Sequence, residues 1–137
     1  MSKQQLPVIM YKGRSLGIVV LVASQIIIGA IHAFFGVLLF TFENISLLPI
    51  TAVYDVYTFI FGLSALIFAV FIWRGKKIGW VGTVAISLFV IAADSLTLLD
   101  LPSIPGIPKF AGLTEIAYSV LIVAYLCGSQ VRKKYLD

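Results

Sequence analysis

Four ionisable side chains stand inside long apolar stretches of this sequence: His32, Asp55, Asp94 and Glu115. If those stretches cross a membrane, each ionisable group there is costly and is a candidate functional residue. One imidazole and several carboxylates form a suitable ligand set for a divalent metal, and they can also relay a proton. Two alternatives stay open: a contact with a partner, and hydrogen bonding between helices, which the sequence favours.

The composition of the chain is that of a membrane protein. Of its 137 residues, 61% are apolar and 12% are charged, and the mean hydropathy is +1.08. An average soluble domain carries about 25% charged residues, so we predict an integral membrane protein. Cys127 is the only cysteine and His32 the only histidine, which excludes an internal disulfide, a multi-cysteine metal site and a bis-histidine haem within one chain. The cofactor is therefore open, with a divalent metal as the one candidate.

Four segments are long and apolar enough to span a membrane as helices. A spanning helix needs about 20 mostly apolar residues, and its backbone must satisfy its own hydrogen bonds in lipid. The segments are approximately residues 15–42, 52–73, 78–99 and 111–128. We predict that residues 1–137 form a single all-α domain, an up-and-down four-helix bundle in the membrane.

The lysine and arginine residues predict the orientation of this bundle. If the chain crosses four times, nine of the ten basic residues lie on one side: Lys3, Lys12, Arg14, Arg74, Lys76, Lys77, Arg132, Lys133 and Lys134. Because cytoplasmic loops carry an excess of Lys and Arg, both termini are predicted to be cytoplasmic. This placement also explains the net charge of +4, so nucleic acid is not expected as a partner.

Small and polar residues recur at helical spacing, which indicates where the helices touch. In the first helix Gln25, Gly29, His32 and Gly36 fall at i, i+4, i+7 and i+11, on one face. Small residues let helix backbones approach, and polar ones form hydrogen bonds across the contact. The predicted interface residues are Gln25, Gly29, Gly36, Gly62 and Ser87. By helical rise, the three acids lie about 5–8 Å inside the outer helix ends and the histidine about 15 Å inside.

Three stretches of the chain carry a resemblance to a known family. Residues 13–19 (GRSLGIV) enter the first helix, residues 71–80 (FIWRGKKIGW) form a basic turn between two helices, and residues 124–126 and 131–136 end the chain. In this layout the sequence resembles small four-span prokaryotic membrane proteins of unknown function. The resemblance implies a four-span fold in the cell membrane of a prokaryote, and it implies no activity.

The leading function that the sequence predicts is non-catalytic. No nucleophile–base pair, phosphate-binding loop or soluble domain is evident in it. We therefore expect an accessory or scaffolding subunit of a larger membrane complex, of the respiratory or metal-dependent oxidase type. Its partners would be the lipid bilayer and other membrane subunits, or further copies of itself. One alternative is a small carrier or sensor that binds a cation, metal or proton at the acidic cluster near the outer face. Another is a membrane enzyme that acts on a lipid or quinone.

Overall fold

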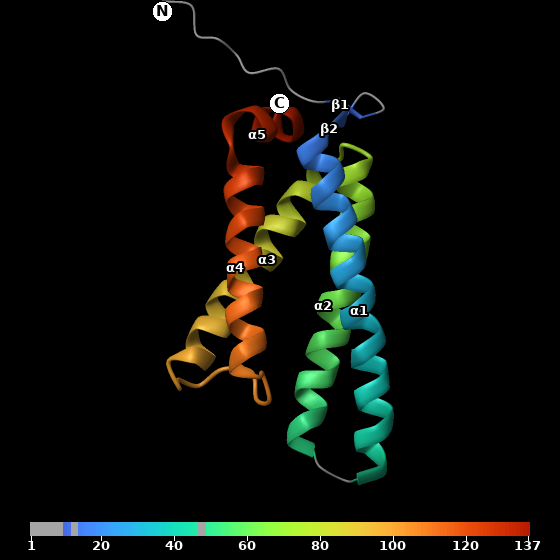
Figure 1. Cartoon of the computed structure of the whole chain (residues 1–137), viewed down its shortest axis with the longest axis vertical. Coiled ribbons are helices and arrows are strands. Elements are labelled where there is room, and N and C mark those ends of the chain that lie inside the picture. The colour runs from blue at the N-terminus through green and yellow to red at the C-terminus, as the bar shows by residue number, and fades with distance from the viewer. Residues whose placement is uncertain (1–9, 12–13, 47–48) are drawn as a thin grey trace, which may run out of the picture.

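The computed structural model describes residues 10–11, 14–46 and 49–137, and within them five helices follow a short β-hairpin (Figure 1). The hairpin pairs β1 (Met10–Tyr11) with β2 (Arg14–Ser15) in antiparallel fashion. The helices are α1 (Leu16–Ser46), α2 (Pro49–Trp73), α3 (Lys77–Leu98), α4 (Lys109–Cys127) and α5 (Ser129–Leu136). Four of them, α1 to α4, are long and apolar enough to cross a membrane, which confirms the prediction of four helices of membrane-spanning length and suggests a multi-pass membrane protein.

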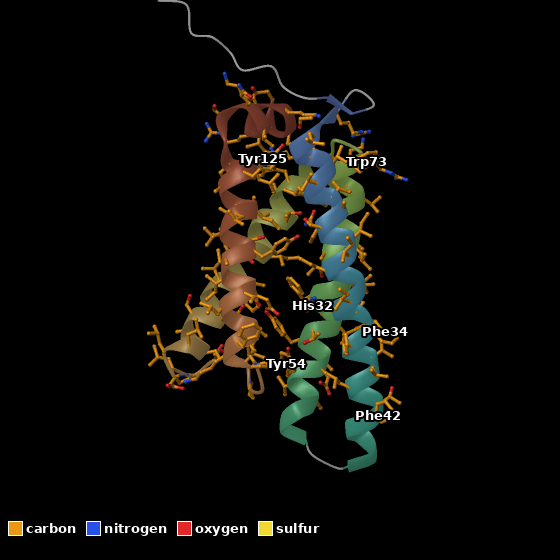
Figure 2. The ribbon with its side chains drawn as sticks, in the orientation of Figure 1. His32, Phe34, Phe42, Tyr54, Trp73 and Tyr125 are labelled. Atoms are coloured by element: carbon orange, nitrogen blue, oxygen red, sulfur yellow. The ribbon has the colours of Figure 1, made fainter. Side chains whose placement is uncertain are left out.

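The helices are apolar on the outside, and most of their polar side chains within the spans lie on the inside. Phe34 is 63% exposed and Leu121 is 70% exposed, and Figure 2 shows Phe34 and Phe42 pointing away from the other helices. Side chains of this kind are stable on the surface only when that surface faces lipid. The buried polar side chains come from all four long helices: Gln25, Asp55, Thr58, Thr83, Ser87, Asp94 and Ser119.

Helices α1 and α2 cross with their backbones in contact. A Cβ atom added to Gly62 would lie 2.6 Å from the carbonyl oxygen of Gly29, and one added to Gly29 would lie 2.9 Å from the carbonyl oxygen of Gly62. Further along, a Cβ atom on Gly36 would lie 2.7 Å from the backbone nitrogen of Phe59. Real Cβ atoms do not approach so closely, so this crossing requires glycine at all three positions.

The turn between α2 and α3 follows from one glycine. Gly75 has a φ of 69°, a left-handed conformation that favours glycine. Its N–H donates to the carbonyl of Ile72 at 2.9 Å, and the N–H of Lys76 donates to the carbonyl of Phe71 at 2.9 Å. These two bonds form a Schellman motif, which ends α2 and turns the chain directly into α3.

One end of the molecule carries Arg74, Lys76, Lys77 and Arg132–Lys134 and is here called the basic end (Figure 1). The hairpin and α5 both lie there. Arg14 stacks over the Trp73 ring, with its guanidinium carbon 4.2 Å from the ring centroid, and donates a hydrogen bond to the Trp73 carbonyl. The cytoplasmic location of both termini remains a prediction.

Helix α5 was not expected, because the sequence prediction ended the last helix at residue 128. Tyr135 is the buried residue of α5, and its hydroxyl donates to the carbonyl of Ile72 at 3.0 Å. Burial raises the pKa of Tyr135 above its ordinary value, which keeps the phenol protonated as a donor. Tyr135 belongs to the apolar layer, which closes the basic end and consists of Ile18, Leu21, Val22, Ala69, Ile72, Ile122, Leu126 and Tyr135.

Candidate functional site

Long polar side chains join α1 to α4. The backbones of α1 and α2, of α3 and α4, and of α2 and α3 pack directly, whereas the α1–α4 contact depends on side chains. Two hydrogen-bonded pairs bridge it: Ser24 Oγ with Tyr118 Oη at 3.0 Å, and His32 Nε2 with Glu115 Oε1 at 3.2 Å. A third pair, Ser15 Oγ with Tyr125 Oη at 3.3 Å, continues the row from the end of β2, directly before α1. Residue numbers rise along α1 as they fall along α4, so these pairs form an antiparallel row. We call this row the α1–α4 seam.

His32 lies in the seam with both ring nitrogens in polar contacts. Its Nδ1 is 2.8 Å from the carbonyl oxygen of Ile28, one turn earlier on α1. A carbonyl oxygen only accepts, so Nδ1 carries the proton there. Nε2 then faces Glu115 Oε1 across 3.2 Å. A hydrogen bond between them requires a further proton, either on the imidazole or on the carboxyl group.

Asp94 adds a second carboxyl group beside Glu115. It is completely buried on α3 and interacts electrostatically with Glu115, and neither of its carboxylate oxygens has a hydrogen-bond partner among the described residues. Gly112 of α4 packs against Asp94, because a Cβ atom there would be in ordinary contact, 3.4 Å from the Asp94 Cβ and 3.6 Å from its Cγ. Two neighbouring carboxyl groups repel each other when both are charged, which favours a proton on one of them. His32, Asp94 and Glu115 together form what we call the His32 cluster.

Aromatic side chains of α2 line the His32 cluster on its third side. The Phe61 ring meets the His32 ring edge-on, with centroids 5.0 Å apart, and the Tyr57 ring stacks on Phe61 at 6.4 Å. The Tyr57 hydroxyl is buried and has no hydrogen-bond partner among the described residues. Figure 2 shows His32 and Tyr54 on the sides of α1 and α2 that face α4. These aromatic side chains give the cluster apolar surroundings, and the Tyr57 hydroxyl is available as a hydrogen-bond donor.

Access to the His32 cluster is unequal at its two ends. The side chains of His32 and Glu115 are 20% and 19% exposed. Toward the basic end, Ile18, Ile122 and Leu126 of the apolar layer fill the space between the helices. A small ion or a proton would therefore reach the cluster from the opposite end or from the side.

The structure brings three of the four predicted ligands together. His32, Asp94 and Glu115 form the cluster, whereas Asp55 is buried beside Gly36, where α2 packs on α1. The reason is that a helix has neighbours on more than one side, and helical spacing alone does not say which one a residue meets. Among the residues that the structure describes, no three His, Cys, Asp or Glu side chains are arranged to hold a metal ion.

The predicted interface residues all lie between helices. Gly29, Gly36 and Gly62 form the α1–α2 crossing described above. Gln25 donates from Nε2 to Thr83 Oγ1 of α3 at 3.1 Å, and Ser87 is buried nearby.

The seam and the surroundings of the His32 cluster contain residues that sequence reasoning missed. Ser24 lies one position off the predicted face of the first helix, Tyr57 lies in an aromatic run typical of lipid contact, and Gly112 precedes Glu115 by one turn. Only Gly112 gave a usable signal, as a small residue on the same helix face as an acid.

Comparison of the chain with protein-family models, with curated proteins and with solved structures gives no match in any of the three. The resemblance to small four-span prokaryotic membrane proteins therefore remains a prediction. What bears on function is the geometry of the His32 cluster and of the seam that contains it.

Proposed function

We propose that this multi-pass membrane protein binds and releases a proton at the His32 cluster and acts as a small proton carrier or sensor. One observation carries the proposal. The Ile28 carbonyl fixes the proton on His32 Nδ1, so the 3.2 Å contact between His32 Nε2 and Glu115 Oε1 needs one more proton. Asp94, buried beside Glu115, places a second carboxyl group where that proton can be shared.

The apolar layer favours proton binding from one side of the protein, and it disfavours a continuous proton channel through it. A proton path needs polar groups or water along its whole length. Between the Ser24–Tyr118 pair and the Ser15–Tyr125 pair, the interior contains Ile18, Leu21 and Ile122 of the apolar layer. A proton bound at the His32 cluster is therefore separated from the basic end until the helices move.

The other predicted functions remain proposals that the geometry favours less. A divalent metal would need three ligands in position, and no three His, Cys, Asp or Glu side chains of the described residues, those of the His32 cluster included, are arranged to hold one. An accessory subunit of a respiratory or metal-dependent oxidase complex, and an enzyme acting on a lipid or quinone, rest on the sequence alone. Native mass spectrometry of the extracted protein addresses both, because larger subunits or a bound apolar molecule would appear as added mass.

The test is proton uptake by the purified protein in lipid nanodiscs. A pH-indicator dye reports the protons taken up when the pH falls from 8 to 5, the range in which a histidine titrates. We expect uptake of about one proton per chain that is lost in both Glu115→Gln and His32→Gln. The matched control is Asp100→Asn, because this carboxylate is exposed in a loop and pairs with Lys109 at 2.6 Å.

The outcomes separate the candidate functions. Uptake by Glu115→Gln equal to that of the unmodified protein would refute proton binding at the cluster. A stoichiometric divalent metal that is present before substitution and absent from Glu115→Gln would replace the proton site by a metal site. Proton flux into dye-loaded liposomes then distinguishes a carrier, which shows flux, from a sensor, which shows uptake without flux.

A further inference from the structure

The four long helices surround a small, mostly apolar cavity with polar side chains on part of its wall, between the His32 cluster and the apolar layer. Its volume is about 20 Å³, and each long helix contributes to its wall. The polar part of the wall comes from α1, α3 and α4: Gln25, Thr83, Ser87, Tyr118 and Ser119. On this measure, a cavity of about 10–15 Å³ is large enough for one water molecule.

The amide of Gln25 shows that this cavity needs an occupant. Gln25 is only 4% exposed, and its Nε2 donates to Thr83 Oγ1 at 3.1 Å. Its Oε1 is buried and has no hydrogen-bond partner among the described residues. A buried amide oxygen without a donor is unfavourable, so it is retained where something in the adjoining space can donate to it.

We propose that the cavity binds one water molecule, which donates a hydrogen bond to Gln25 Oε1 and lies among the hydroxyl groups of Ser87 and Ser119. An internal water molecule requires two to four polar partners, and the wall of this cavity provides them. Serine hydroxyls both donate and accept, so they can complete either side of the water.

The chemistry of the wall favours water over a cation. Every polar group in it is an amide or a hydroxyl, and no charged side chain lines the cavity in the described part of the chain. An ion in the middle of a membrane needs a compensating charge, because its desolvation is costly. A neutral molecule with two donors and two acceptors meets the requirements of this wall without one.

The water extends the α1–α4 seam by one bridge. Gln25 is on α1 and Ser119 on α4, so a molecule bonded to both lies between the Ser24–Tyr118 pair and the His32–Glu115 pair. Ser119 follows Glu115 by one helical turn, about 6 Å. The water is therefore the first polar group that follows the His32 cluster in the direction of the basic end. The proposed water site does not depend on proton binding, so a His32 cluster that binds no proton would not contradict it.

Solid-state NMR in lipid bilayers tests the water site. Magnetisation is transferred from water to the side-chain amides of protein labelled with ¹⁵N-glutamine, and Gln25→Leu identifies the Gln25 signal by its loss. We expect transfer to the buried Gln25 amide to be as rapid as transfer to the exposed Gln130 amide. Ser119→Thr adds a methyl group to the cavity wall and should lower the Gln25 transfer several-fold. The matched control is Ser129→Thr, the same change at the exposed start of α5.

Three results would overturn the water site. Slow transfer to Gln25 in the unmodified protein would show that the cavity is dry. Transfer that is unchanged in Ser119→Thr would place the water elsewhere. A Gln25 signal that shifts when sodium replaces potassium would indicate a bound cation in place of water. If circular dichroism shows that Ser119→Thr is unfolded, Ser87→Thr fills the same cavity from α3 and gives the same readout.

Discussion

Replacing Gly62 with alanine should force α1 and α2 apart. The added Cβ atom would lie 2.6 Å from the carbonyl oxygen of Gly29, whereas non-bonded heavy atoms rest about 3.5–4.0 Å apart. The obstructing atoms belong to the backbone of α1, so no side-chain rotation relieves the clash. The two helices must separate by about 1 Å at the crossing, and the contacts around Gly29 and Gly36 loosen with it.

The expected loss of stability follows from two opposing effects. Overpacking of this kind costs about 1–3 kcal/mol. Alanine is the better helix former, which returns up to about 1 kcal/mol. Because the clash is with backbone atoms, we take the upper part of the first range, about 2–3 kcal/mol. We therefore expect Gly62→Ala to lower the free energy of unfolding by about 1–2 kcal/mol, measured by reversible unfolding in mixed micelles with circular dichroism as the signal.

Gly112→Ala is the matched control on α4. Its Cβ atom would make ordinary contacts, at 3.4 Å to the Asp94 Cβ and 3.6 Å to the Asp94 Cγ. It gains the same helix propensity without a backbone clash, so its stability should equal or exceed that of the unmodified protein. If Gly62→Ala proves as stable as Gly112→Ala, the helices do not cross as closely as the structure shows.

Three further predictions concern α5 and the seam. Tyr135→Phe removes the hydrogen bond to the Ile72 carbonyl and should destabilise α5 by about 1 kcal/mol, seen as faster amide exchange in α5. Burial raises the pKa of Tyr135, so its stabilising effect is full below the ordinary value of about 10 and is lost as the pH rises through the folded value. Tyr135→Phe should abolish this alkaline loss, and a loss that persists in the variant would have another source. A double-mutant cycle of His32→Gln and Glu115→Gln should give a coupling energy of about 1 kcal/mol in the same unfolding assay, and additive effects would contradict the bridge.

The inward faces of the helices could be predicted because lipid imposes a simple rule. Positions that face lipid are apolar, so a small or polar residue at helical spacing marks the inside. Gln25, Gly62, Ser87 and Asp94 stand out on this basis in an otherwise apolar background, and the structure buries all of them. The rule needs no knowledge of which helices are neighbours.

The pairing of side chains across the seam could not be predicted in the same way. The distance between α1 and α4 depends on how the glycine crossing places α1 on α2 and on how α2 packs on α3. That distance decides whether Tyr118 reaches Ser24, and the spacing of residues along one helix does not predict the distance between two helices. Helix α5 escaped notice for a related reason. It is short and basic, and a single residue, Tyr135, anchors it.

The contacts that α1 makes with α2 and with α4 differ in a way that bears on the proposed function. Its contact with α2 is backbone against glycine, which tolerates no change in separation at Gly29 and Gly62. Its contact with α4 is made by hydrogen bonds between side chains, one of which joins His32 to Glu115. Adding or removing a proton alters the charge and the donors of that bond, and it leaves the glycine crossing unchanged. A structural response to proton binding is therefore expected as movement of the α3–α4 pair relative to the α1–α2 pair, with the seam as the part that opens.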